Sequence, residues 1–293
     1  MEWYLYAILG SLFTGFAALT HKKGRVSKTK SLDFSATLAI INLIISVPFL
    51  FILDYSQLTD KAFFILFFGS FFATGGFFYF TKAIKHMELS KATPFLAFGP
   101  VVIAFFAFIF LGERLSLIQI IGIILIIFGA LFLESDKKFS LKELYKDLKY
   151  LKYVFISLII YGVSALVDRI LLSKSGAFAM DTITYLTLMH VFIALNFFML
   201  TFILSEGFHS IKKAFSVSGV WIILLAIFTF TYRFFQSKAM EIAPAAAFVS
   251  VIKRSSIVIT VFLGGKLFHE GKLYKKMIAT IIMVLGNFLI ILF

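Results

Sequence analysis

The chain has 293 residues, of which 61% are hydrophobic and only 15% are charged. A water-soluble domain of this length would carry about a quarter charged residues, so the composition argues against a soluble enzyme or binding module. The sequence has no cysteine, which excludes disulfides, zinc–thiolate sites, iron–sulfur clusters and thiol catalysis, and its formal net charge is +13.

Ten apolar segments follow one another along the chain, each long enough to cross a bilayer core, which takes about 20 helical residues. The connections between them are short and leave no room for a soluble domain. We therefore predict an all-α membrane protein with ten transmembrane helices. The expected segments are 3–21, 34–53, 62–84, 92–111, 115–133, 153–173, 182–204, 219–240, 242–264 and 274–293.

The last five segments repeat the first five. Tyr6 and Gly15 in the first segment have the same spacing as Tyr153 and Gly162 in the sixth. Because each half holds an odd number of helices, the second copy must enter the membrane in the opposite direction. Many secondary transporters are built from such inverted repeats, with the substrate site where the halves meet.

A charged connection divides the two halves. We predict a first repeat of five helices over 1–133, a cytoplasmic linker over 134–151 and a second repeat of five helices over 152–293. Within the linker, Ser140 and Glu143 fit a capping box, and leucines recur at helical spacing opposite lysines. This pattern is typical of a short amphipathic helix that lies in the membrane interface.

The basic residues fall mainly in alternate connections. The region between the first and second segments and the linker over 134–151 are rich in lysine, whereas the connections on the other side hold few basic residues. The positive-inside rule then makes the lysine-rich side cytoplasmic and leaves both termini outside. We expect a multi-pass protein of the plasma or inner membrane that contacts lipid, with no nucleic-acid partner.

One stretch carries a family resemblance. It begins at Ala83, passes Pro100 and ends in Gly112-Glu113-Arg114-Leu115, and it resembles the EamA-type repeat of the drug/metabolite transporter superfamily. The segment 242–264, which ends near Glu270, resembles a second copy. The resemblance implies that helices 1–4 and 6–9 surround a central cavity, that helices 5 and 10 are peripheral, and that the cargo is a small metabolite.

Two adjacent cations lie deep in the ninth segment. Lys253 and Arg254 are about ten residues into it, roughly 15 Å deep at 1.5 Å per residue. Ionisable residues at this depth are costly and are functional candidates by default. With the hydroxyl of Ser250 beside them, they would bind an anion, since an arginine fork suits phosphate or carboxylate.

The alternative is a structural charge cluster that protein carboxylates neutralise. Asp168 is the candidate partner, with Arg169 next to it, and Asp168 is also where proton coupling would run. One carboxylate cannot balance these cations unless Glu241 or Glu270 also reaches the cavity. We expect Glu270 instead to lie at a helix end, where it caps the next helix.

Lys253 and Arg254 also resemble, in residue type and helix, the pair that holds phosphate in plastid-type sugar-phosphate exchangers of this superfamily. Tyr232 stands where those carriers place a tyrosine. Gln236 and Tyr161 lie in helices expected to line the cavity, where they are candidates either for substrate contact or for hydrogen bonds between helices.

These patterns predict a secondary transporter of a small anionic or zwitterionic metabolite that works by alternating access. An exporter of amino acids or amphipathic drugs is the first alternative, and a non-transporting scaffold or receptor is a more distant one. We expect no catalytic residue, cofactor or metal, since His269 and Glu270 lack the second histidine of a metalloprotease motif. Small residues in helices 5 and 10 would allow a homodimer as well as a monomer.

Overall fold

The computed structural model of the protein describes residues 2–24, 28–99, 101–102, 116–134, 141–174, 176–244 and 246–292. Pro100 and the Gly112–Leu115 boundary motif lie outside these residues. Within them the regular secondary structure is entirely helical, which confirms the predicted all-α class.

The helices follow the predicted segments closely, and several begin at a polar side chain that caps them. Thr59 accepts a hydrogen bond from the backbone of Ala62, and Asp181 accepts from the backbone of Ile183 and Thr184. The elements are α1 (Trp3–Lys23), α2 (Ser31–Ser46), η2 (Val47–Ile52), η3 (Tyr55–Gln57), α3 (Asp60–His86), α4 (Leu89–Ala92), η4 (Pro94–Phe98), α6 (Leu117–Glu134), α7 (Leu141–Leu172), α8 (Thr182–Leu204), α9 (Phe208–Ile242), α10 (Ala246–Arg254), α11 (Ser256–Leu267) and α12 (Leu273–Leu292).

Eight of these helical stretches are long and apolar enough to cross a membrane, and α6 is a shorter apolar helix. The fourth predicted segment is described only at its start, where α4 and η4 lie. The helices as a whole are consistent with the predicted ten-helix fold. The predicted linker helix is continuous with the sixth span, because α7 runs unbroken from Leu141 to Leu172. Its interfacial position stays a prediction.

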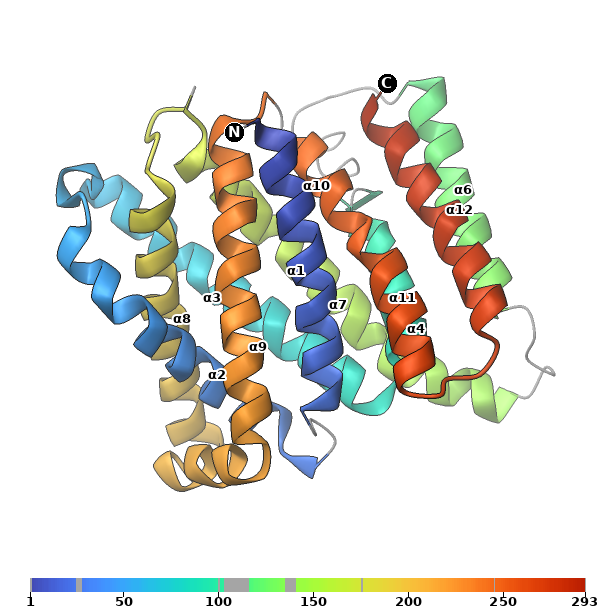
Figure 1. Ribbon diagram of the computed structural model, residues 1–293, viewed down its shortest axis with the longest axis horizontal. Helices are drawn as coiled ribbons and strands as arrows, with labels where there is room; N and C mark the ends of the chain where they lie inside the picture. Colours follow the sequence, from blue (N-terminus) through green and yellow to red (C-terminus); the bar gives the residue numbers. More distant parts are fainter. Residues whose placement is uncertain are drawn as a thin grey trace.

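Helix packing repeats across the two halves. Helix α1 packs on α9, and its counterpart α7 packs on α3, the counterpart of α9. The counterparts α2 and α8 pack on each other, as do α6 and α12, which stand side by side at one end of the molecule in Figure 1. This pairing is what an approximate two-fold axis in the membrane plane would produce.

Two glycines contact each other reciprocally, as a two-fold axis between them requires. A Cβ added to Gly122 would lie 2.6 Å from the carbonyl oxygen of Gly286, and a Cβ added to Gly286 would lie 2.6 Å from the carbonyl oxygen of Gly122. Small residues allow this close backbone approach. Gly122 and Gly286 therefore hold α6 and α12 together within one chain, and the choice between a monomer and a homodimer stays a prediction.

A second matched contact lies at the two ends of the molecule. Lys22, in the last turn of α1, donates hydrogen bonds to the carbonyl oxygens of Ile84 (2.6 Å) and Met87 (2.5 Å), where α3 ends. Arg169, near the end of α7, donates to the carbonyl oxygens of Met240 (3.4 Å), Ala243 (3.3 Å) and Pro244 (3.1 Å), where α9 ends. Basic side chains commonly satisfy the last carbonyls of a helix in this way.

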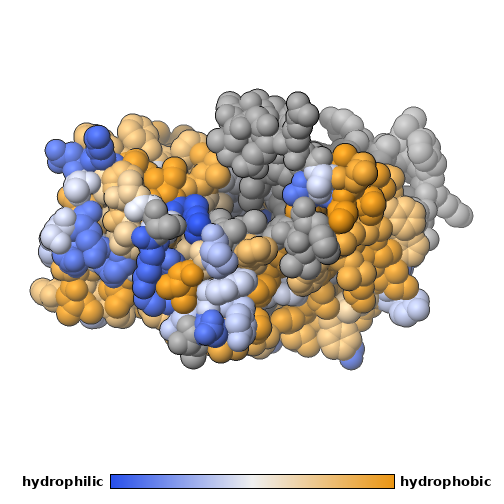
Figure 2. All heavy atoms as spheres, turned by 90° about the horizontal axis from the view of Figure 1, so that it is seen from above, coloured by the Kyte–Doolittle hydropathy of each residue, from blue (hydrophilic) through white to orange (hydrophobic). Residues whose placement is uncertain are grey.

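Both chain ends lie at the same end of the helix bundle, at the top of Figure 1, and the lysine-rich turn after α1 lies at the opposite end. In the view onto the terminal face in Figure 2, hydrophilic side chains gather on the face and apolar side chains dominate its flanks. The segregation of lysine between the two faces and the assignment of one face to the cytoplasm stay predictions.

Candidate functional site

A cavity of about 220 Å³ lies where α1, α3, α7, α9 and α10 converge. Its wall carries aromatic rings such as Phe77 and Phe80 together with an unusual number of polar and charged side chains. Of the site residues predicted from the sequence, those that line the cavity are Lys253, Arg254, Tyr232, Gln236, Ser250, Tyr161 and Asp168.

Lys253 and Arg254 lie where α10 meets α11 in the ninth span. Helix α10 ends at Arg254, a single turn residue follows, and α11 begins at Ser256, whose hydroxyl donates to the carbonyl oxygen of Lys253 (2.6 Å). The ammonium of Lys253 lies 6.0 Å from the centre of the Tyr232 ring. The backbone of Ser255 keeps helical dihedral angles, and its N–H donates to the carbonyl oxygen of Ile252 (3.2 Å), so the span tightens for one turn beside the cations.

The guanidinium of Arg254 lies against the backbone of the fourth span. A Cβ added to Gly99 would be 2.0 Å from Nη2 of Arg254, so a larger residue at this position would displace the guanidinium. The Nε atom of Arg254 is buried and has no hydrogen-bond partner. Within the part of the chain that the structure describes, neither Arg254 nor Lys253 forms an ion pair.

Positive charge exceeds negative charge in the cavity wall. Arg233, on α9, lines it together with the two cations of α10, and among the described lining residues Asp168 is the sole carboxylate. Asp168 accepts a short hydrogen bond from the hydroxyl of Tyr185. Three cations therefore face one carboxylate.

The two other candidate carboxylates are engaged elsewhere. Glu241 pairs with Lys238 (2.9 Å) and Lys174 (3.5 Å) and accepts from the hydroxyl of Thr182 (2.7 Å). Glu270 accepts from backbone N–H groups at the start of α4, in the other half of the chain. Our expectation that Glu270 caps the next helix is thus replaced by a cap across the two halves.

Two predicted residues have other contacts. Arg169 does not line the cavity, because its guanidinium donates to the carbonyls that end α9. Gln236 does line it, but its amide also donates to the hydroxyl of Thr14 (2.8 Å), which joins α9 to α1. Tyr161 lies with its ring against Gly76, where an added Cβ would be 2.8 Å from the ring.

The structure adds residues that the predicted site did not include. Arg233 could have been chosen from the sequence, since it is a lone arginine inside an apolar segment. Tyr185 and His21 could not, because their place in the wall depends on how distant helices pack. His21 is stacked between Phe34 and Phe77, with ring centres 5.1 and 5.3 Å away.

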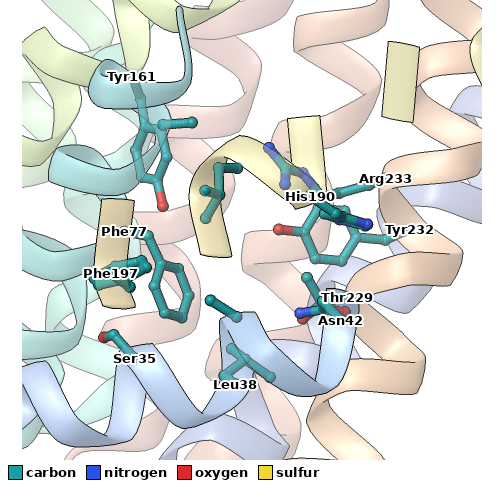
Figure 3. Close-up of a pocket in the computed structure, with 13 residues that line it drawn as sticks. Ser35, Leu38, Asn42, Phe77, Tyr161, His190, Phe197, Thr229, Tyr232 and Arg233 are labelled. Atoms are coloured by element: carbon teal, nitrogen blue, oxygen red, sulfur yellow. The ribbon is translucent and has the colours of Figure 1, made fainter. Parts of the chain in front are cut away.

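A smaller pocket of about 60 Å³ adjoins the cavity and shares part of its wall, including Tyr161, Tyr232 and Arg233. Figure 3 shows the two tyrosine hydroxyls turned toward the space between them, with Asn42, Thr229 and His190 grouped on the side of Tyr232. The pocket lies between α2, α3, α7, α8 and α9, and none of its described lining residues comes from α10.

Comparisons with known proteins agree with this architecture. A solved structure described only as "Crystal structure of protein" is 13% identical in sequence, has a TM-score of 0.57, and is similar over 95% of each chain; at that identity the likeness shows the fold alone. No curated protein matches the chain. The model of the EamA-like transporter family matches residues 1–135, which span the first predicted repeat. Residues 1–135 are thus similar to an EamA-like transporter domain, and that family belongs to the drug/metabolite transporter superfamily.

Proposed function

We propose that the protein is a secondary transporter that carries a small anion, or a zwitterion bound by its anionic end, through the central cavity by alternating access. The observation that carries the proposal is the excess of positive charge in the cavity wall. Lys253, Arg254 and Arg233 face a single carboxylate, Asp168, which is already hydrogen-bonded to Tyr185.

An anion would resolve an unfavourable arrangement. Buried charges are costly unless they are paired, and three cations in a low-dielectric cavity leave a surplus of about two positive charges. A carboxylate or phosphate would supply the missing charge and could accept bidentate hydrogen bonds from a guanidinium. An amphipathic cation, one cargo of the alternative exporter, would meet three like charges.

The position of the cations in the ninth span supports this proposal. They lie beside Ser255, the one residue between α10 and α11, and the cavity that they line has walls from both halves of the chain. Transporters with inverted repeats place their sites where the repeats meet and change access by rocking one part of the molecule against the other.

The test is uptake of radiolabelled organic anions and phosphate esters into liposomes that contain the purified protein. We expect Lys253→Gln and Arg254→Gln each to reduce uptake at least tenfold, because each variant removes a cation that the anion needs. Lys266→Gln is the matched control. Lys266 belongs to α11, in the same span as the two cations, but its ammonium lies over the ring of Phe262 and outside the cavity. Wild-type rates in both cavity variants would rule out the anion site.

A further inference from the structure

Several polar side chains that line the smaller pocket form no hydrogen bond within the described part of the chain. Asn42 and Thr229 are buried, and the side-chain oxygen of Asn42 is fully enclosed without a partner. The hydroxyls of Tyr161 and Tyr232 and the guanidinium of Arg233, which are half-buried, also form no hydrogen bond with the described residues. These groups come from α2, α7 and α9 and meet in one space of about 60 Å³.

His190, on α8, adds a hydrogen-bond acceptor. The hydroxyl of Ser46 donates to the carbonyl oxygen of Asn42 (2.8 Å), so the Nδ1–H of His190 must be the donor in its 2.8 Å bond with Ser46 Oγ. The other ring nitrogen, Nε2, is then an acceptor, and it is buried without a partner.

Two polar residues near the pocket have hydrogen-bond partners within the protein. Asn196, on α8 like His190, donates to the hydroxyls of Ser70 (2.8 Å) and Thr74 (3.4 Å). Gln236, one turn beyond Tyr232 on α9, bonds to Thr14. Buried polar groups in proteins normally form hydrogen bonds. A cluster of polar groups without hydrogen-bond partners around an open space therefore indicates a ligand.

We propose that this pocket binds the hydroxyl groups of the transported anion, which makes the substrate a small hydroxylated anion. The proposal rests on the proposed function, because the charged end of the substrate would lie on Lys253 and Arg254, with Arg233 between the two pockets. A hydroxyl both donates and accepts, which suits an amide, a neutral imidazole nitrogen and phenol groups at once.

The charge and the size of the pocket narrow the class of substrate. An ammonium group would lie beside Arg233, so a neutral hydroxyl is favoured over the amino group of a zwitterion. At about 10–15 Å³ per water molecule, the pocket holds the equivalent of roughly four waters, enough for one or two hydroxylated carbons. The surplus of two positive charges in the main cavity suits a doubly charged phosphate ester.

The experiment compares three probes that share one charged end: glycerol 3-phosphate, propyl phosphate and 3-aminopropyl phosphate. Binding is measured as the concentration-dependent shift in thermal unfolding of the purified full-length protein in detergent. We expect glycerol 3-phosphate to bind about tenfold more tightly than propyl phosphate, since two hydroxyls would form hydrogen bonds of ordinary strength. We expect 3-aminopropyl phosphate to bind most weakly.

Asn42→Leu tests the pocket directly. It should reduce the preference for glycerol 3-phosphate over propyl phosphate to about threefold or less, without weakening propyl phosphate. The ligand-free variant should be no less stable than the wild type, because the amide it removes has no partner. Asn287→Leu is the matched control: Asn287 is also buried and unpartnered, but on α12 outside the pocket, so the preference should be unchanged.

The outcomes separate the two proposals. Equal binding of the hydroxylated and propyl probes, or an unchanged preference in Asn42→Leu, would show that the pocket holds only water and would overturn this inference alone. Tighter binding of the amino probe would overturn the assignment to hydroxyls. Failure of all three phosphate esters to bind would instead count against the proposed function.

Discussion

Asp168 is the single side chain on which the energetics of the cavity depend most. Among the described lining residues it supplies the one negative charge that faces three cations, and the hydroxyl of Tyr185 fixes its orientation. A carboxyl group in this position can gain or lose a proton as the cavity fills and empties. Asp168 is therefore the residue through which proton coupling would operate.

We expect Asp168→Asn to abolish uptake driven by a pH gradient while exchange of internal for external substrate continues, because asparagine has the same shape but cannot carry the proton. The measurement is uptake into proteoliposomes with and without an imposed gradient. Glu206→Gln is the control, since Glu206 is exposed on the connection between α8 and α9. If the pH gradient does not change uptake by the wild type, or still drives uptake by Asp168→Asn, Asp168 does not have this role.

At the residue scale, the sequence identified site residues where a charged side chain stands within an apolar segment. Lys253, Arg254 and Asp168 could be chosen because charges within apolar segments are expensive and rarely incidental. Arg169 was misleading: its position next to Asp168 indicated a charge partner, but adjacent residues on a helix point in different directions, and its side chain caps α9 instead. The smaller pocket could not be predicted from the sequence, because Asn42, His190 and Thr229 come together only through the packing of α2, α8 and α9.

At the element scale, the connection between α11 and α12 holds the two halves together at the lysine-rich end. Glu270 accepts hydrogen bonds from the backbone N–H groups of Leu89 and Ser90 (both 2.9 Å) and a short bond from the Ser90 hydroxyl. Lys276 pairs with Glu88 (2.6 Å) and lies 3.7 Å from Glu270. The start of α4 is thus capped by a residue more than 170 positions away in the chain.

We expect Glu270→Ala to lower the free energy of unfolding by about 3 kcal/mol, because it leaves the cation of Lys276 and two backbone donors under-satisfied in a buried place. Unfolding in detergent, followed by circular dichroism against denaturant, measures the change. Glu206→Ala is the comparison: its contact with His209 is long (3.9 Å) and exposed, so its loss should change stability by less than about 0.5 kcal/mol. Equal stability of the two variants would contradict a structural role for the cap.

At the scale of the whole molecule, hydrophobic periodicity was enough to predict the all-α fold with ten helices in two halves. Those features follow from the physics of the bilayer, which imposes helix length on any sequence. What they could not specify is the contact between halves. The glycines of α6 and α12 fit a dimer surface equally well, and only the fold shows that Gly122 and Gly286 pack on each other.

Because these two glycines are equivalent about the approximate two-fold axis, Gly122→Ala and Gly286→Ala should have the same effect. Each added Cβ would meet the partner backbone at 2.6 Å, and we expect each to destabilise the protein by about 1–3 kcal/mol, with values within about 0.5 kcal/mol of each other. Gly75→Ala is the control, because its Cβ would have ordinary contacts of 3.6 Å. Thermal unfolding in detergent compares the three, and clearly unequal losses would argue against the axis.

The helix caps made by Lys22 and Arg169 have a mechanical consequence. Each fastens two helices of one half at a single end: α1 to the end of α3, and α7 to the end of α9. In the alternating-access mechanism proposed above, we expect each pair of helices to separate at the end without the cap. Because the two caps lie at opposite ends of the helix bundle, the first half would then open toward one side of the membrane and the second half toward the other side.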